Sequence, residues 1–143
     1  MRYPEQLIAP MRADLKQYGV AEARTPDEVS RLLAPGSGSV LMIVNSVCGC
    51  AAGKARPAVG MALSNHIKPD TVASVFAGAD LEAVARLREL LPGIPPSSPS
   101  MALFQDGKPV FMLHRHQIES RQAPEIAQLL TQAFDQYCAT AKQ

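Results

Sequence analysis

The alternation of apolar and polar positions along the chain predicts a sheet covered by helices. Residues 39–45 (SVLMIVN) and 71–78 (TVASVFAG) are nearly continuous apolar runs, too short for helices, and they predict strands buried on both faces. Residues 20–25 (VAEART) predict a short edge strand. Apolar residues recur at helical spacing in four further segments, residues 4–19, 25–36, 51–63 and 80–93. Because helices alternate with strands, this part of the chain favours parallel strand–helix units.

The last third of the chain breaks this alternation. Asp106 and Gly107 separate two apolar runs within residues 101–115 (MALFQDGKPVFMLHR), and this dipeptide is a strong signal for a tight β-hairpin turn. Residues 123–143 then predict a closing amphipathic helix. Its apolar face carries Ile126, Leu129, Leu130, Ala133, Phe134 and Tyr137. The whole pattern predicts an α/β fold in which parallel units give way to an antiparallel hairpin.

Single residues refine the expected helices. Thr25 is a predicted N-cap, followed directly by a proline, and Glu28 would complete a capping box. Asp80 is predicted to cap the helix that begins after it. Pro10 and Pro57 fall inside helical patterns, and proline has no amide proton to donate. We therefore expect a kink or a break at Pro10, and a kink without a break at Pro57.

The composition limits the size, partners and compartment of the protein. Its 143 residues are 47% hydrophobic and 19% charged, with a formal net charge of +1, which predicts one domain over residues 1–143 and no basic surface for nucleic acid. No uncharged apolar run approaches the roughly 20 residues that span a bilayer, so we expect no membrane partner and a cytoplasmic location. Three cysteines, an odd count, argue against a disulfide framework and favour reduced thiols.

Two of the cysteines lie one residue apart, where a predicted strand turns into a predicted helix. Sites in open α/β sheets commonly form at such turns. A helix N-terminus stabilises a thiolate, so the pKa of Cys48, the first and less enclosed cysteine, should fall. Gly49 lets the backbone bend, which allows Cys48 and Cys50 to approach the separation that a disulfide requires. Such a short ring would be strained and easily reduced, which suits a catalyst or a sensor.

Other interpretations of these cysteines stay open. Both side chains could pack as small buried hydrophobes, the usual role of a reduced cysteine. The two thiolates could instead hold a soft ion such as Cu(I). A zinc site could recruit His114 or His116, although zinc usually takes four ligands and more widely spaced cysteines.

The remaining candidates have ordinary structural interpretations. His66 follows a helix and is expected as a charge near its C-terminus. His114 and His116 should alternate along one solvated strand face. Cys138 is expected to be an inert packed thiol on the last helix. We assign a catalytic role to none of these four residues.

Taken together, the motifs resemble the thioredoxin fold. In that fold a cysteine motif opens a proline-kinked helix, and a cis-proline near the catalytic cysteine precedes the first hairpin strand. Pro99 in residues 97–104 (SSPSMALF) has the corresponding place, and cis bonds occur essentially only before proline. Three stretches, residues 44–58 (VNSVCGCAAGKARPA), 95–119 (PPSSPSMALFQDGKPVFMLHRHQIE) and 133–138 (AFDQYC), resemble the bacilliredoxins, bacterial proteins with a C-G-C active site. The resemblance covers residues 3–138.

This resemblance implies a thioredoxin-like fold with a central mixed sheet of four or five strands, flanking helices and an extra N-terminal helix. It also implies a thiol-disulfide oxidoreductase that removes bacillithiol, or a similar low-molecular-weight thiol, from S-thiolated client proteins. Weak disulfide reductase or isomerase activity is also expected of the family.

Residue roles follow from the same resemblance. Cys48 would be the nucleophile and Cys50 the candidate resolving thiol, with Gly49, Ser98 and Pro99 facing the substrate. The small thiol would act as co-substrate, and neither a bound cofactor nor a metal is expected. A second hypothesis is a binding module without turnover, which carries a soft metal ion on the C-G-C thiols or acts as a redox-regulated adaptor.

Overall fold

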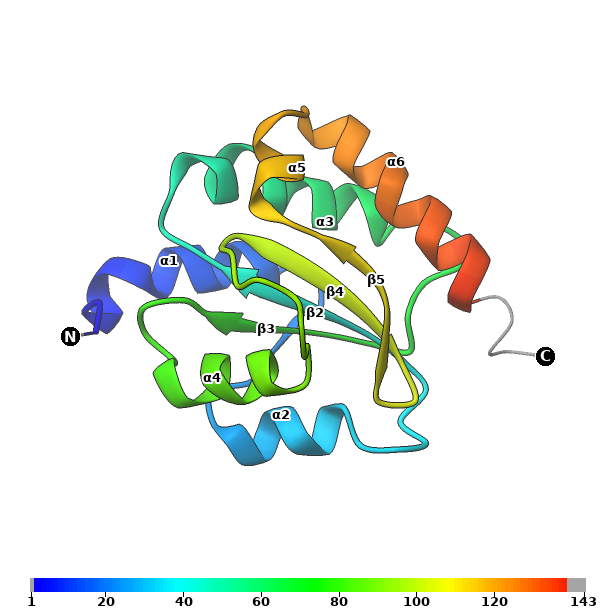
Figure 1. The fold of residues 1–143 in the computed structure, drawn as a ribbon. Helices are drawn as coiled ribbons and strands as arrows, with labels where there is room; N and C mark the ends of the chain where they lie inside the picture. Colours follow the sequence, from blue (N-terminus) through cyan, green and yellow to red (C-terminus); the bar gives the residue numbers. More distant parts are fainter. Residues whose placement is uncertain (1, 139–143) are drawn as a thin grey trace.

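A five-stranded mixed sheet forms the centre of the molecule in the computed structural model, which describes residues 2–138 (Figure 1). Its strands are β1 (Ala21–Glu22), β2 (Ser39–Asn45), β3 (Thr71–Phe76), β4 (Ser100–Gln105) and β5 (Lys108–Leu113). Their order across the sheet is β1-β3-β2-β4-β5. β1, β3 and β2 run parallel, whereas β4 is antiparallel to β2 and β5 is antiparallel to β4. The predicted change from parallel units to a hairpin is confirmed, with the short β1 at one edge.

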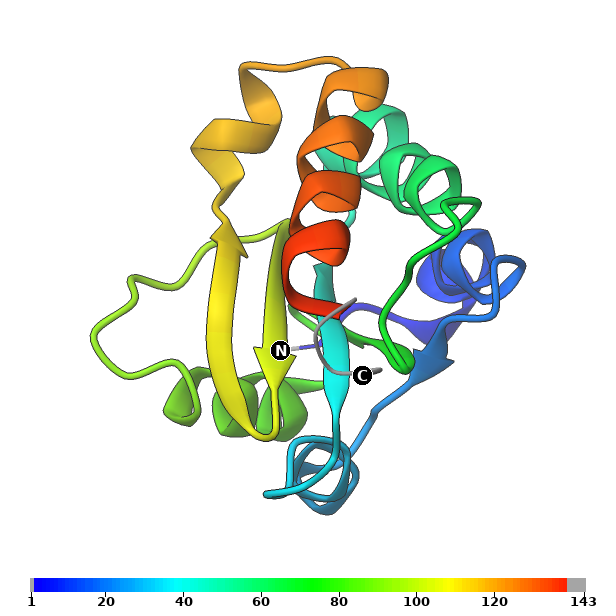
Figure 2. The same cartoon turned by 90° about the vertical axis from the view of Figure 1, so that its right-hand side faces the viewer.

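Helices cover both faces of this sheet. They are α1 (Glu5–Lys16), α2 (Pro26–Leu32), α3 (Arg56–Ala62), α4 (Leu81–Glu89), α5 (Arg115–Glu119) and α6 (Ala123–Ala133), with π-helical turns η1 (Ala51–Ala55) and η2 (Phe134–Cys138). Figure 1 shows α2 and α4 on one face and α3 and α6 on the other, and Figure 2 shows α6 lying next to α3. The predicted extra helix at the N-terminus is α1, which packs against α3 and β1.

Side chains of β2 enter two separate apolar cores. Successive side chains of a strand point to opposite faces of the sheet. Leu41 and Ile43 join the core with α3 and α6. Val40, Met42 and Val44 join the core with α2 and α4. Every residue of β2 is buried, so the loop at its carboxyl end starts from a firmly held strand.

The predicted hairpin turn is present between β4 and β5. Asp106 and Gly107 both have positive φ, 51° and 84°, as a two-residue type I′ turn requires. A β-carbon on Gly107 would lie 2.7 Å from the carbonyl oxygen of Leu33, so the position requires glycine for space as well as for conformation. The Asp106 carboxylate accepts a hydrogen bond from the N–H of Gly38 at 2.9 Å, which ties the turn to the start of β2.

The predicted N-cap of α2 is confirmed. The Thr25 hydroxyl oxygen accepts the N–H of Glu28 at 3.2 Å. The Glu28 carboxylate in turn accepts the N–H of Arg24 at 3.1 Å, so the second half of the expected capping box is made one residue earlier than expected.

The predicted position of Asp80 at the N-cap of α4 is confirmed, but the capping hydrogen bond expected of its side chain is not made. Its carboxylate instead accepts two hydrogen bonds from Arg12 of α1, at 2.8 and 2.9 Å, and one from the N–H of Phe76 at 3.0 Å. Arg12 and Asp80 are both buried, and a buried charge needs a partner more than a helix end needs a cap.

The two helical prolines are accommodated without a break. α1 is continuous through Pro10. Before Pro57, the helical segment begins as the π-helical turn η1, in which the N–H of Arg56 donates to the carbonyl of Ala51 five residues back. The helical segment is continuous through Pro57, as predicted, and a kink at this proline stays a prediction. The closing helix is seen as α6 and η2, and residues 139–143 of its predicted span lie outside the described residues.

Candidate thiol site at the carboxyl end of the central strand

Cys48 and Cys50 lie in the loop that joins β2 to η1. The carbonyl of Cys48 accepts the N–H groups of Ala51 and Ala52 at 3.1 and 3.2 Å, so Cys48 stands directly at the first helical turn. Both cysteines are partly buried and Gly49 is exposed. The expectation that Cys50 is more covered than Cys48 stays a prediction.

Ser46 holds the backbone in front of Cys48. Its hydroxyl oxygen accepts the N–H of Cys48 at 3.2 Å, and its own N–H donates to Oδ1 of Asn45 at 2.9 Å. These bonds fix the course of the chain between the strand and the cysteines. Sequence reasoning missed Ser46, although a serine two residues before a loop position is a frequent turn former.

The pKa of Cys48 lies below the ordinary value of a cysteine. Burial raises this pKa, because the thiolate loses hydration in the loop. Hydrogen bonds from the Ser46 hydroxyl and from the N–H groups of Ala51 and Cys50, together with the charge of Arg115, outweigh that effect. Because the thiolate is the nucleophilic form of cysteine, the loop favours a reactive Cys48.

A buried arginine supports the same loop. Arg56, in the first turn of α3, is 4% exposed, and its Nη1 donates to Oδ1 of Asn45 and to the carbonyl of Ser46, both at 3.1 Å. Its Nε lies 3.2 Å from Oδ2 of Asp14 on α1, an ion pair without the geometry of a hydrogen bond. Arg56 therefore ties the loop before Cys48 to two helices.

The register of the sheet brings Pro99 to this end of β2. The Ser98–Pro99 peptide bond is cis, as predicted. Ser100 pairs with Val44, so the preceding Pro99 lies beside the last residue of β2. Pro99 is buried and Ser98 partly buried. A direct contact between Pro99 and Cys48 stays a prediction.

Arg115, the first residue of α5, is hydrogen-bonded to the two residues before Pro99 and to the end of its own helix. Its N–H donates to Oγ of Ser97 at 3.2 Å, and its Nη1 donates to the carbonyl of Ser98 at 2.8 Å. Its Nε donates to the Glu119 carboxylate at 3.0 Å. The thiolates of the C-G-C motif and Glu119 raise the pKa of Arg115, with the Glu119 hydrogen bond as the main cause. Sequence reasoning missed Arg115, whose position after a hairpin gave no signal.

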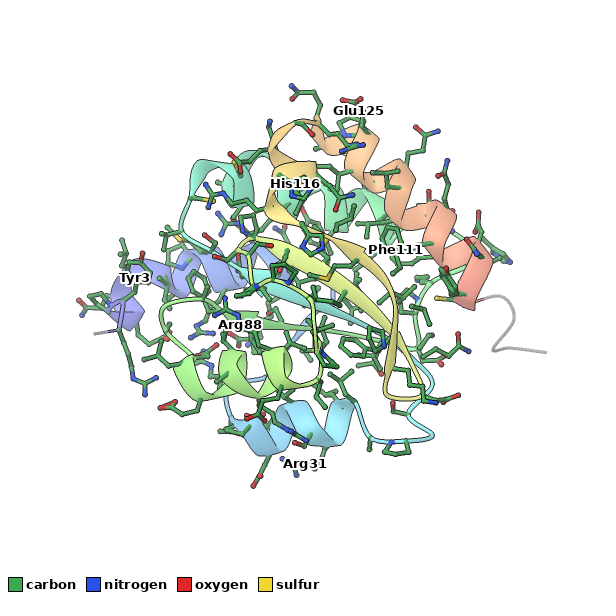
Figure 3. The ribbon with its side chains drawn as sticks, in the orientation of Figure 1. Tyr3, Arg31, Arg88, Phe111, His116 and Glu125 are labelled. Carbon is green, nitrogen blue, oxygen red and sulfur yellow. The ribbon has the colours of Figure 1, made fainter. Side chains whose placement is uncertain are left out.

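The prediction that His114 and His116 alternate on a strand face was wrong. β5 ends at Leu113, and His114 is the N-cap residue of α5. Its N–H donates to the side chain of Gln117 at 2.8 Å, which starts the helix at once. The two imidazole rings stack with centroids 5.7 Å apart, and His116 is exposed on α5 (Figure 3).

The other candidates lie apart from the thiol loop. His66 is exposed in the segment between α3 and β3, beyond the helix end where it was expected. Cys138 is fully buried in the core shared with α3 and α6, which confirms the predicted packing.

Metal ligands do not gather in the part of the chain that the structure describes. Among residues 2–138, no group of three or more His, Cys, Asp or Glu side chains is placed to hold a metal ion. A zinc site with four protein ligands is therefore not assembled by these residues. A soft ion on two thiolates needs only Cys48 and Cys50 and stays a hypothesis. The described helices include none long and apolar enough to cross a membrane.

The sheet topology, the cysteine pair after β2 and the cis-proline before β4 define a thioredoxin-fold thiol protein. The thioredoxin of Malassezia sympodialis matches with a TM-score of 0.57 at 17% identity, over 83% of this chain and 90% of that one. Thioredoxin O2 of Arabidopsis thaliana, in its oxidized state, matches with a TM-score of 0.54 at 14% identity, over 82% of this chain and 96% of that one. These structures establish the fold.

Sequence similarity establishes the family. The family model described as disulphide isomerase matches residues 3–138. A bacilliredoxin of Salinibacter ruber is 53% identical over 141 residues, which are 96% of this chain and 82% of the relative. Bacilliredoxins of Koribacter versatilis and Bacillus licheniformis are 49% and 47% identical, over 97% and 95% of both chains respectively. The chain belongs to the bacilliredoxin family, a family of thiol-disulfide oxidoreductase type, as the motifs indicated.

Proposed function

We propose that this protein removes a low-molecular-weight thiol from S-thiolated client proteins. The observation that carries the proposal is the Cys48 thiol, whose pKa is lowered by hydrogen bonds within its loop and which lies two residues before a second partly buried thiol. The bacilliredoxin relatives support bacillithiol, or a similar thiol, as the cap. The small thiol is a co-substrate, so the reaction needs no bound cofactor. The three reduced cysteines favour action in the cytoplasm.

The first step is an exchange of one disulfide for another. The Cys48 thiolate attacks the cap sulfur of the mixed disulfide on the client. The bond between cap and client breaks, the client cysteine leaves as a thiolate, and a new disulfide joins Cys48 to the cap. The hydrogen bonds from Ser46 and the first helical turn keep the attacking thiolate populated near neutral pH. Gly49, Ser98 and Pro99 would face the client during this step.

A second thiol must then release the cap from Cys48. If Cys50 attacks the Cys48 sulfur, the cap leaves as a thiolate and a Cys48–Cys50 disulfide forms, which an external thiol must reduce with two electrons. If a second small thiol attacks the cap sulfur instead, the cap and the attacking thiol leave together as a small-molecule disulfide, and the Cys48 thiolate is restored. Both routes conserve electrons, and they differ in whether Cys50 is oxidised.

A capped model client tests the proposal. Cys48→Ser should abolish removal of the cap, whereas Cys50→Ser should retain the first transfer and accumulate capped Cys48, visible as added mass on the intact protein. Cys138→Ala is the matched control and should behave as wild type, because Cys138 is fully buried in the core. Cap removal by Cys48→Ser would overturn the proposal. Stoichiometric metal on the purified protein, with no cap removal, would favour the metal-carrying module instead.

A further inference from the structure

Arg115 presents an anchored positive charge at the cis-proline side of the thiol loop. Its side chain is 40% exposed, so it is open to solvent. Nη1 is held by the carbonyl of Ser98 at 2.8 Å, and Nε is held by the carboxylate of Glu119 at 3.0 Å. Two anchors on different atoms fix the plane of the guanidinium, which lowers the entropy cost of using its remaining N–H groups.

The helix that carries Arg115 packs next to the thiol loop. α5 packs against η1, the turn that follows Cys50, and Lys54 of η1 donates to the carbonyl of Glu119. The charge of Arg115 stabilises the Cys48 thiolate, and the thiolates of Cys48 and Cys50 in turn stabilise the cation. A small cap bound to Cys48 is therefore expected to experience the positive charge of Arg115.

The charged residues near Arg115 leave its guanidinium able to bind an anionic group. Glu119 is itself half exposed, so water weakens its offset of the Arg115 charge. Arg56, the cation on the other side of the loop, is buried and paired with Asp14. Of these two arginines, Arg115 is the one that a solvent-borne group can approach.

We propose that Arg115 is a specificity-determining residue that favours caps carrying a carboxylate. A planar guanidinium donates well to a carboxylate, and the anchors at Ser98 and Glu119 hold it at the cis-proline loop, on the helix that packs against the turn after Cys50. The inference rests on the proposed function, because it concerns the cap exchanged in that reaction. A neutral cap of the same size would gain nothing from this charge.

The test compares two caps on one model client cysteine: mercaptoacetate, which is anionic, and 2-mercaptoethanol, which is neutral. For each variant kcat/KM is measured with both caps, and each value is divided by the rate constant of the same capped client with dithiothreitol in solution. The ratio of the two corrected values reports selectivity. Changes in Cys48 nucleophilicity cancel in this ratio, because the same thiolate attacks both caps.

Arg115→Met should lower the anionic-to-neutral ratio about two- to fivefold, the size of effect that an exposed ion pair supplies. Arg115→Lys should keep only part of the ratio, since the charge remains but the anchored planar guanidinium is lost. Glu119→Gln should raise it, because the amide oxygen can still accept the Nε–H of Arg115 while the competing negative charge is lost. Arg121→Met is the matched control and should leave it unchanged, since Arg121 donates to the carbonyl of Gln117 at the far end of α5.

The outcomes separate this inference from the function on which it rests. If the wild type and Arg115→Met both remove the two caps with the same anionic-to-neutral ratio, the proposed role of Arg115 is overturned and the proposed function stands. If Arg115→Met does not fold, an unchanged ratio in Glu119→Gln overturns it equally. Removal of neither cap by the wild type overturns both proposals.

Discussion

Replacing Arg56 by methionine should weaken the fold moderately and slow the chemistry of Cys48. Methionine keeps most of the apolar volume of the buried side chain but removes its charge and its donors. The change deletes two hydrogen bonds, to Oδ1 of Asn45 and to the carbonyl of Ser46, and the ion pair with Asp14. These three partners are affected differently, and the differences set the magnitude.

The carbonyl of Ser46 accounts for most of the cost. It loses the donor that Arg56 supplies, and an unsatisfied buried acceptor costs about 1–3 kcal/mol. Oδ1 of Asn45 keeps the N–H of Ser46 at 2.9 Å, so it remains satisfied. Asp14 has a half-exposed side chain that water can solvate, so its lost partner contributes about 0–1 kcal/mol. We expect a total loss of about 1–4 kcal/mol in the free energy of unfolding.

The effect on Cys48 should follow from the same contacts. Without Arg56 the loop at Ser46 is held less firmly, and the Ser46 hydroxyl stabilises the Cys48 thiolate less well. Arg56 and the thiolate also attract each other directly. The pKa of Cys48 should therefore rise toward the ordinary value, and alkylation at pH 7 should slow.

Urea denaturation and the pH profile of iodoacetamide alkylation measure the two effects. Arg86→Met is the matched control, because Arg86 makes a hydrogen bond to Ser30 at 2.8 Å between α4 and α2, on the opposite face of the sheet. That variant should leave the pH profile of alkylation unchanged. Arg56→Lys should restore part of the profile through its charge. An Arg56→Met protein with wild-type stability and a wild-type pH profile would refute this reasoning.

Four further predictions use the same measurements. Alkylation of Cys48 should reach half its maximal rate at a lower pH than alkylation of an unperturbed thiol such as glutathione, since the pKa of Cys48 is lowered. The pKa of Cys48 is lower in the folded state than in the unfolded state, so the Cys48 thiolate stabilises the reduced protein at a pH above the unfolded-state pKa. This stabilisation should be lost as the pH falls through the folded-state pKa. Cys48→Ser should remove the dependence. Arg12→Met should cost about 3–5 kcal/mol of unfolding free energy, because it leaves the Asp80 carboxylate buried with one N–H donor; a loss below about 1 kcal/mol would contradict this. Gly107→Ala should cost about 1–3 kcal/mol, from its positive φ and the 2.7 Å approach to Leu33, and wild-type stability would contradict it.

The local sequence pattern was enough to predict the elements whose structure depends on residues near them in the chain. The continuous apolar run of residues 39–45 predicts a strand buried on both faces, and β2 is buried at every position. The turn at Asp106 and Gly107 was equally predictable, because positive φ is a property of those residues. The placement of Cys48 and Cys50 in one loop was predictable because one residue separates them.

Predictions failed where a distant residue competed for a side chain. Asp80 has the sequence signature of a cap, yet Arg12, 68 residues away, takes its carboxylate. His114 continues an apolar strand pattern, yet it turns into α5, whose start lies against the loop of residues 97–98 through the bonds of Arg115. Neither partnership leaves a periodic trace in the sequence.

The sequence by itself therefore determined the strands, most of the helices and the placement of the cysteine pair, because each depends on propensity, periodicity or adjacency. Only the tertiary structure decided what surrounds that pair. The pairing of Ser100 with Val44 brings the cis-proline loop to the end of β2, and the packing of α3 and α5 brings Arg56 and Arg115 to it. These placements depend on strand register and on burial of the two cores, which are properties of the whole chain and not of any segment.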